Sequence, residues 1–543
     1  MGLAPYTGCM MKKRHIHISI VTLIILTYCF TLGVSAPTST ASTNSLRDIS
    51  NSYAREQIRA LQSSGIVSGD EKGYFHPENP VTRAEFVSML DRTLGIKPVA
   101  SSVPSFTDVP KSSWAYGYVQ AAVSLDMANG TSSTTFSPNR TISRQEAATF
   151  LVRAMGLQAS STATPSVKDA NAISNWARPA VSAAIKKQWL VGYQGYFRPG
   201  AALSREETAV ILKRILDELN ATTVSAKPLV SLGWQYQSTT QEFIAQVQKS
   251  GINTLSPRWY FLQKNGSISD YTDASLVHWA QKNGKEVWAL FGNQFDPTTT
   301  HAVLSDKSKR TAVVQKLVSF VDKYQLDGIN VDFEGFNPDD RDNFTAFIKE
   351  LGTALHAKGA VLSVDVPPDT GTDWSEPFDY EKLALHADYV VLMAYEEHWV
   401  GSPKAGSVAS LPWFENVIKG VLDDVPAQKL IAGIPLYTRD WYSAGGQVQS
   451  TDISIPESYQ LISQYKTTTK WDEALGQYRS TFTKQGVSHS IWLEESRSLG
   501  LKAQTSLTWQ IGGLAYWYIG SESTDVWTSI ANSIALKQAR QKM

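Results

Sequence analysis

The chain has 543 residues, 42% of them hydrophobic and 18% charged, so most of it can bury a core and global disorder is excluded. At roughly 100–200 residues per domain, this length allows three to five domains. Lysine plus arginine and aspartate plus glutamate balance at 50 each. This balance argues against a bulk electrostatic grip on nucleic acid or on an anionic membrane, so we expect no nucleic-acid partner.

Residues 1–36 have the pattern of a secretory signal peptide. A basic cluster at Lys12 to Arg14 precedes a mostly apolar stretch from Ile16 to Leu32, and small residues follow at Val34 to Ala36. A retained membrane anchor is the competing interpretation, because about 20 apolar residues suffice to span a bilayer. We expect cleavage and no retained membrane span. Both cysteines lie inside this segment, so the mature protein is expected to have no disulfide.

Residues 46–220 contain a threefold repeat. Its markers recur at intervals of 61 residues: Phe75, Phe136 and Phe197; Arg83, Arg144 and Arg205; Glu85, Glu146 and Glu207. Thr82, Ser143 or Ser204 precedes each arginine, and a threonine or serine followed three residues later by glutamate predicts a capping box at a helix start. We expect modules at residues 46–103, 104–164 and 165–220.

Capping does not need the arginine of this motif, and three equivalent guanidinium groups could bind anionic groups bidentately. The stretches Gly73 to Pro77 and Val81 to Glu85 resemble an S-layer homology module, and the later copies resemble it too. The resemblance implies a mainly helical three-module bundle that binds secondary cell-wall polymer through Arg83, Arg144 and Arg205. It also implies a secreted protein anchored to the bacterial cell wall or S-layer.

After a linker at residues 221–227, short β-rich segments alternate with helical ones. Eight strands are predicted, at residues 229–236, 252–260, 286–291, 328–333, 361–366, 389–395, 430–437 and 513–518. Eight strands alternating with helices are typical of a (β/α)8 TIM barrel, an α/β fold, here expected over residues 226–543. The extra length at residues 442–511 predicts a small α+β insertion between the seventh and eighth strands.

The fourth predicted strand carries the most informative motif, Asp327-Gly-Ile-Asn-Val-Asp-Phe-Glu334. Alternation directs Asn330, Asp332 and Glu334 into the barrel and the apolar residues between them towards the helices. Carboxylates at positions i and i+2 lie roughly 6.6 Å apart along a strand and repel each other. One of them is therefore expected to hold a proton near neutral pH, as a general acid must.

This strand resembles the Asp-x-x-Asp-x-Asp-x-Glu signature of glycoside hydrolase family 18. Met393 to Tyr395, Ile434 to Arg439 and Trp517 resemble other segments of that family. Residues 396–399 and 410–413 resemble a bacterial branch that includes spore-cortex and cell-wall glucosaminidases. The family mechanism needs no cofactor, and no spacing of histidine, cysteine and aspartate suggests a metal site.

The resemblance implies a retaining, substrate-assisted hydrolysis of β-1,4 linkages in a glycan that contains N-acetylglucosamine. Glu334 would be the general acid, Asp332 would hold the 2-acetamido N–H, Tyr395 would donate to its carbonyl oxygen, and Trp517 would lie under the sugar. Asn330, Tyr437, Arg439 and Glu396 are further candidates for substrate binding, although Tyr437 and Arg439 are as readily explained by packing and a salt bridge. Asn330 stands in place of the inner aspartate of the signature, and Glu396 stands where many members have aspartate.

Three functions remain open from the sequence. The first is a wall-anchored hydrolase of peptidoglycan or chitin, with the branch resemblance favouring peptidoglycan. The second is a non-catalytic carbohydrate-binding barrel, and the third is a purely structural surface-layer protein. An intact Asp332, Glu334 and Tyr395 favours the hydrolase, since a protein that only binds sugar needs no proton donor.

Overall fold

The computed structural model describes residues 46–158, 165–222 and 228–543. The predicted signal peptide, with both cysteines, and most of the predicted linker lie outside the described residues. Within the described ranges, no helix has both the length and the apolar character needed to cross a membrane.

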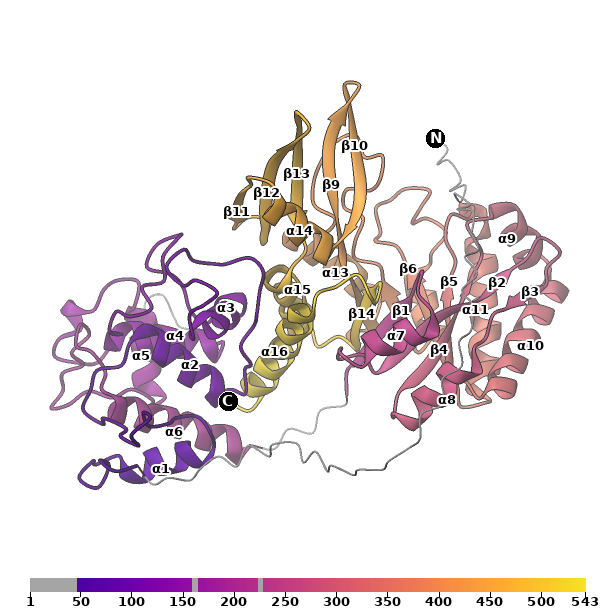
Figure 1. The fold of residues 1–543 in the computed structure, drawn as a ribbon. Coiled ribbons are helices and arrows are strands. Elements are labelled where there is room, and N and C mark those ends of the chain that lie inside the picture. Colours follow the sequence, from indigo (N-terminus) through magenta and orange to yellow (C-terminus); the bar gives the residue numbers. More distant parts are fainter. Residues whose placement is uncertain (1–45, 159–164, 223–227) are drawn as a thin grey trace, which may run out of the picture. The chain divides into compact units, whose positions relative to one another are not determined.

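Each module of the repeat contributes two helices, so the helical character predicted for residues 46–220 is confirmed (Figure 1). The helices are α1 (Arg55–Ser63), α2 (Arg83–Thr93), α3 (Tyr116–Ser124), α4 (Arg144–Ala154), α5 (Arg178–Lys186) and α6 (Arg205–Ala221). Thr82, Ser143 and Ser204 cap α2, α4 and α6, and in each case the glutamate three residues later completes the predicted capping box.

The three modules pair with one another cyclically, and each bridge joins a cap residue to the residue two positions before another cap. Isolated antiparallel bridges join Thr82 to Thr141, Ser143 to Ala202, and Pro80 to Ser204. The repeating phenylalanines at positions 75, 136 and 197 are all fully buried in one shared core. The modules therefore form a single bundle rather than a string of independent units.

The second part of the chain is a closed barrel of eight parallel strands, which confirms the predicted TIM barrel. The strands are β1 (Val230–Gln235), β2 (Thr254–Leu262), β4 (Glu286–Gly292), β5 (Gly328–Asp332), β6 (Val361–Val366), β7 (Tyr389–Leu392), β8 (Leu430–Pro435) and β14 (Gly513–Trp517). They pair in this order, and β14 pairs with β1 to close the barrel. A short strand, β3 (Ile268–Asp270), pairs antiparallel with β2.

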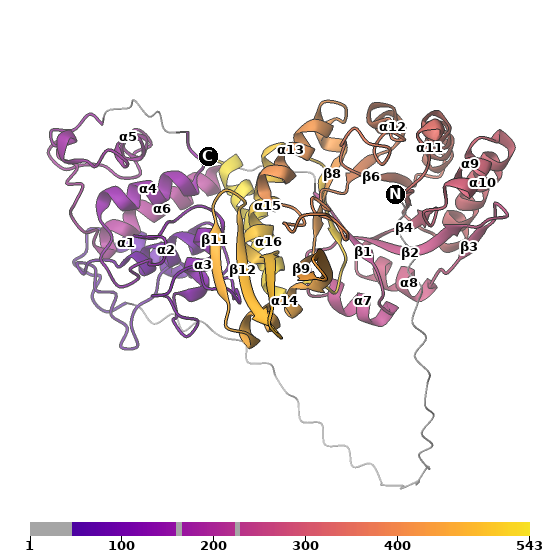
Figure 2. The same ribbon diagram turned by 90° about the horizontal axis from the view of Figure 1, so that it is seen from above.

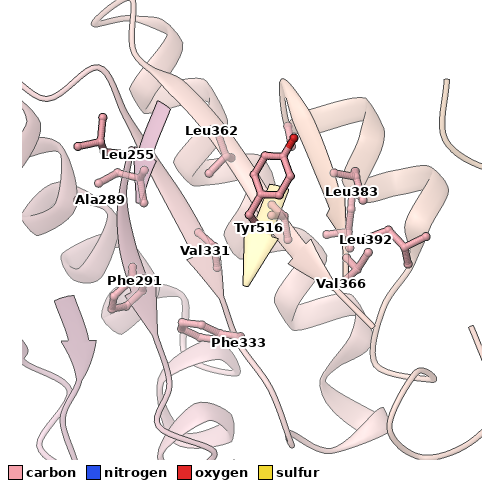
Figure 3. Close-up of a cluster of buried hydrophobic side chains, with 14 of the residues drawn as sticks. Leu255, Ala289, Phe291, Val331, Phe333, Leu362, Val366, Leu383, Leu392 and Tyr516 are labelled. Atoms are coloured by element: carbon pink, nitrogen blue, oxygen red, sulfur yellow. The ribbon is translucent and has the colours of Figure 1, made fainter. Parts of the chain in front are cut away.

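Helices follow the barrel strands and cover their outer side, as Figure 2 shows for α9, α10, α11 and α12. The helices of this part are α7 (Thr240–Val247), α8 (Ala274–Lys282), α9 (Pro297–Leu304), α10 (Lys307–Tyr324), α11 (Arg341–His356), α12 (Tyr380–His386), α13 (Leu411–Leu422), α14 (Ile455–Gln464), α15 (Ser496–Thr508) and α16 (Thr524–Gln541). Outward residues such as Val331, Phe333 and Leu362 pack into the large core between strands and helices (Figure 3).

An antiparallel sheet is inserted between β8 and β14, where the sequence predicts an α+β insertion. Its five strands pair in the order β10 (Gln447–Ser454), β9 (Tyr437–Ala444), β13 (Val487–Leu493), β12 (Gln477–Lys484), β11 (Thr468–Asp472). The sheet begins at Tyr437, five residues before the predicted start, because the chain passes from β8 into β9 with only Leu436 between them. Residues just beyond the carboxyl end of β8 therefore belong to the insertion.

Candidate active site

Side chains at or just beyond the carboxyl ends of five barrel strands, together with Tyr437 of β9, meet in one cavity of about 160 Å³. The cavity is lined by Trp234, Asp332, Glu334, Asp365, Met393, Tyr395, Glu396, Tyr437 and Trp517. The three residues expected to be catalytic are therefore brought together, as are Trp517, Tyr437 and Glu396. Asn330 and Arg439 do not line the cavity.

Burial raises the pKa values of the Asp332 and Glu334 carboxyl groups in this cavity. It raises the pKa of Asp332 to about 6, with Arg258 opposing the shift. The pKa of Glu334 lies well above its usual range because of burial and because of the negative charge of Asp332. The cavity therefore holds a proton near neutral pH, and the raised pKa of Glu334 favours its protonated form.

Asp365 is a third buried carboxylate that sequence reasoning missed. It is 2% exposed and lies on β6. In the parallel register Asn330 is opposite Ser363, so Asp365, two residues further along, lies level with Asp332. Burial and the charge of Asp332 raise the pKa of Asp365 well above its usual range. Alternation along Val361–Val366 directs Ser363 and Asp365 to one face, and this signal could have identified the residue.

Asn330 lies beneath the cavity and has a full set of hydrogen bonds. Its Nδ2 donates to Ser363 Oγ at 3.0 Å and to Asp365 Oδ1 at 2.7 Å. Its Oδ1 accepts from Trp234 Nε1 and from Ser256 Oγ, both at 2.9 Å. Two donors and two acceptors are thus used within the protein, which leaves Asn330 to position its neighbours and not to contact a sugar.

The backbone of Glu334 is fixed from β4. Asn293 follows that strand and is 1% exposed; its Oδ1 accepts from Glu334 N–H at 3.0 Å and its Nδ2 donates to the Glu334 carbonyl at 2.8 Å. β5 itself ends at Asp332. This pair of side-chain hydrogen bonds replaces the ladder beyond the strand end and holds Glu334 above the cavity.

Tyr395 reaches the cavity because β7 ends before it. The strand stops at Leu392, and successive backbone hydrogen bonds from Ala394 to Leu392 and from Tyr395 to Met393 turn the chain at once. A side chain at Gly433 of β8 would approach the Tyr395 ring to 3.3 Å, so this glycine leaves the space that the ring occupies.

Glu396 follows Tyr395 in a strained conformation, with φ of 72°. For a residue other than glycine, this backbone region costs on the order of 1–3 kcal/mol. Arg439, 2% exposed, donates to both Glu396 carboxylate oxygens at 2.8 and 2.9 Å, and Tyr437 donates its hydroxyl to the same group. Arg439 also pairs with Asp452 of β10 at 2.7 Å, so the salt-bridge interpretation holds for it.

Trp517 lines the cavity and lies edge-on to Trp234, with ring centroids 5.9 Å apart. The other tryptophans near strand ends differ in position: Trp259, Trp288 and Trp441 are buried in cores, and Trp399 is 50% exposed.

The three motif arginines of the modules close a ring of ion pairs. Nη1 of Arg83 contacts Glu146 at 2.8 Å, that of Arg144 contacts Glu207 at 3.2 Å, and that of Arg205 contacts Glu85 at 3.2 Å. Each Nε donates to the carbonyl of a repeating phenylalanine in the same partner module. Each capping glutamate therefore also receives the arginine of another module, and the polymer-binding role of the three arginines stays a prediction.

Comparison with family models identifies both parts of the chain. The model described as "Glycosyl hydrolases family 18" matches residues 234–522. The model of the S-layer homology domain matches three times, at residues 45–87, 105–148 and 168–209.

Three similar proteins come from bacteria. The chain is 30% identical over 291 residues to "Uncharacterized glycosylase YvbX" of Bacillus subtilis, covering 51% of this chain and 84% of that protein. It is 24% identical to "Cortical fragment-lytic enzyme" of Bacillus anthracis, covering 50% of this chain and 66% of that enzyme. Over 197 residues it is 29% identical to "Surface-layer 125 kDa protein" of Lysinibacillus sphaericus, covering 35% of this chain and 16% of that protein.

Solved structures share the barrel. A chitinase from Chromobacterium violaceum matches with a TM-score of 0.52 and 25% identity over 56% of this chain and 99% of that one. The Bacillus cereus spore cortex-lytic enzyme SleL also has a TM-score of 0.52, over 56% of this chain and 74% of that one, and its 21% identity shows the fold alone. On these matches and this geometry, the chain belongs to glycosyl hydrolase family 18 and carries three S-layer homology domains before its family 18 domain.

Proposed function

We propose that the protein cleaves β-1,4 linkages of a glycan containing N-acetylglucosamine, with retention and with the substrate's own acetamido group as nucleophile. One observation carries the proposal: Asp332, Glu334 and Tyr395 line a single cavity with Trp517, and burial keeps a proton on its carboxylates. A protein that only binds sugar does not need a carboxylic acid that stays protonated near neutral pH.

In the first step, Glu334 donates its proton to the glycosidic oxygen. The acetamido carbonyl oxygen attacks the anomeric carbon as the glycosidic bond breaks, which gives a cyclic oxazolinium ion. Asp332 accepts a hydrogen bond from the acetamido N–H and balances the positive charge of the oxazolinium ion. The Tyr395 hydroxyl donates a hydrogen bond to the attacking oxygen. Glu334, now ionised, then takes a proton from water, whose oxygen attacks the anomeric carbon. The bond from that carbon to the acetamido oxygen breaks, which reopens the ring and restores the original configuration.

The neighbouring residues have supporting roles in this proposal. Trp517 lies against the sugar ring. Asn330 and Asp365 hold the floor of the cavity, and Arg439 and Tyr437 hold the carboxylate of Glu396. This division retains Glu396 and Trp517 as candidate contacts with substrate and gives Asn330 and Arg439 positioning roles.

We further propose that the S-layer homology domains bind secondary cell-wall polymer and hold the enzyme at the cell wall. Three such domains support surface anchoring. Their motif arginines form ion pairs with the capping glutamates of neighbouring modules. A bound anionic polymer therefore either shares the guanidinium groups with these glutamates or replaces the glutamates.

The test is turnover of a chromogenic N-acetylglucosamine oligomer by the full chain and by Glu334→Gln. We expect the variant to bind the oligomer and to lose at least ~10²-fold in turnover, since glutamine keeps the shape and cannot donate the proton. The first product should retain its anomeric configuration by NMR. An inverted first product or wild-type turnover by the variant would refute the mechanism.

A further inference from the structure

Arg258 is a cation beside the cavity that the proposed mechanism does not use. It lies on β2, where the pairing with β4 shifts register between Arg258 and Tyr260. Its guanidinium carbon lies 5.1 Å from the ring centroid of Tyr236, 5.6 Å from that of Phe261 and 5.9 Å from that of Trp517. Since Trp517 lines the cavity, the guanidinium stands at the edge of the sugar platform.

No polar partner of this guanidinium lies among the described residues. Among the described residues it makes no hydrogen bond and no ion pair, and its Nε is buried without a partner. Leaving a buried donor unsatisfied costs roughly 1–3 kcal/mol, and more for a charged group. Arg258 is partly buried, whereas the buried arginines Arg83 and Arg439 are paired with Glu146 and Glu396.

Pairing with the catalytic carboxylates does not explain Arg258. Neither Asp332 nor Glu334 lies within ion-pair distance of it, although its charge lowers the pKa of both. Stacking on aromatic faces orients a planar guanidinium and leaves its N–H groups directed outwards along its edge. The arrangement fits a planar anionic ligand that arrives with the sugar, because a guanidinium binds a carboxylate through two parallel hydrogen bonds.

We propose that Arg258 binds a carboxylate carried by the glycan, and that this group is the lactyl carboxylate of N-acetylmuramic acid. The inference rests on the proposed function and names its substrate class. Chitin has no carboxylate, whereas alternate sugars of the peptidoglycan strand carry a lactyl ether. An arginine without a partner at the platform therefore selects the muramic acid glycan over the neutral one.

The proposal also gives the enzyme a place in a reaction sequence. In intact peptidoglycan, a lactyl group that carries a stem peptide is an amide and has no charge. Hydrolysis of this amide adds water, releases the peptide as a free amine and leaves the carboxylate on the sugar. An amidase reaction must therefore supply the preferred substrate, and this protein acts on strands whose peptides have been removed.

The experiment compares three substrates with the full chain: a neutral chito-oligosaccharide, a glucosamine–muramic acid oligosaccharide with free lactyl carboxylates, and the same oligosaccharide with peptides attached. Each is N-acetylated. We expect kcat/KM at least ~10-fold higher for the free carboxylate form than for either other substrate. Conversion of its carboxylates to methyl esters should remove the preference, which tests the proposal without any mutation.

Arg258→Gln should lower kcat/KM on the carboxylate substrate by ~10²-fold and change it less than ~3-fold on the chito-oligosaccharide. Arg258→Lys keeps the charge but lacks the planar guanidinium. Its kcat/KM on the carboxylate substrate should lie between those of the wild type and Arg258→Gln. Because Arg258 lowers the pKa of Asp332, each variant is compared at its own pH optimum. Arg479→Gln is the matched control, since Arg479 is exposed and stacks on Trp492 at 5.0 Å in the insertion, outside the cavity lining.

Equal loss on the charged and neutral substrates, or no preference by the wild type, would overturn the proposal. Failure of the proposed function is separate: the wild type would then cleave none of the three. In that case calorimetry measures binding of the oligosaccharides to Glu334→Gln and to the double variant that also carries Arg258→Gln. Tighter binding of the free carboxylate oligosaccharide that Arg258→Gln abolishes supports the assignment of Arg258, and equal binding by both overturns it.

Discussion

At the residue scale, Asn330 and Asp365 form a buried hydrogen-bonded pair across neighbouring strands. The family signature has an aspartate where this chain has Asn330, and the structure places the carboxylate of Asp365 2.7 Å from the Asn330 amide. A further carboxylate at position 330 would add a buried negative charge below Asp332, at a high desolvation cost. The amide avoids this cost and still satisfies four polar partners.

Asp332→Asn should make stability less dependent on pH. The folded-state pKa of Asp332 is raised to about 6, so the folded state retains a proton that the unfolded state loses. Its contribution to stability is present below pH ~4 and declines as the pH rises towards 6. At pH 7 we expect the variant to exceed the wild type by on the order of 2 kcal/mol in unfolding free energy, with no gain at pH 3.

Denaturant unfolding at the two pH values measures this difference. A variant that is less stable than the wild type at both values would contradict burial as the cause of the raised pKa.

Glu396→Gln should move the basic limb of the pH profile of kcat/KM to lower pH. The charge of Glu396 is one of the causes that raise the pKa of Glu334. Without that charge, the general acid loses its proton at lower pH and activity falls earlier. Glu397→Gln is the control, because that carboxylate accepts from Ser410 N–H and does not line the cavity. An unmoved limb in Glu396→Gln would show that its charge does not reach Glu334.

At the scale of elements, the capping motif of the modules has two structural functions. Each glutamate caps its own helix and also receives the arginine of another module, so helix starts and module contacts depend on one side chain. Breaking such a pair leaves a buried charge without compensation, and the loss is large where burial is deepest. The arginine side chains are 3%, 5% and 17% exposed at positions 83, 144 and 205.

Arg83→Ala should therefore destabilise the bundle by about 3–5 kcal/mol, and Arg205→Ala by less. Arg59→Ala, which removes only an exposed pair with Glu56, should cost less than ~1 kcal/mol and serves as the control. Thermal unfolding of the full chain measures all three. Equal stability of Arg83→Ala and Arg59→Ala would show that the ring is not structural.

At the scale of the whole molecule, anchoring and hydrolysis are assigned to different parts of the chain. The S-layer homology domains match residues 45–209 in three segments, and the family 18 domain matches residues 234–522. Wall binding and catalysis should therefore be separable by mutation. A variant without the general acid measures anchoring while the wall stays intact.

Full-length Glu334→Gln should sediment with purified cell walls and should stay in solution after the secondary polymer has been removed chemically. Three modest sites on one polymer gain from effective concentration, so loss of the polymer should abolish retention rather than weaken it. Retention on polymer-free walls at the original level would show that the modules do not anchor through this polymer.

The sequence by itself determined what depends on local periodicity. The 61-residue interval defined the repeat, Thr82 and Glu85 specified a capping box, and alternation along Gly328–Asp332 directed Asn330 and Asp332 inwards. These features depend on neighbours a few residues apart, and backbone geometry fixes such neighbours.

Only the tertiary structure decided which distant residues meet. The register between β5 and β6 brings Asp365 to Asn330, the closure of the modules brings Arg205 to Glu85, and the barrel brings Arg258 to Trp517. Pairing of strands and modules far apart in the chain is set by packing of the whole core, and no local pattern encodes it. For the same reason, the burial that raises the pKa of Glu334 and the unpaired Nε of Arg258 became visible only in the folded barrel.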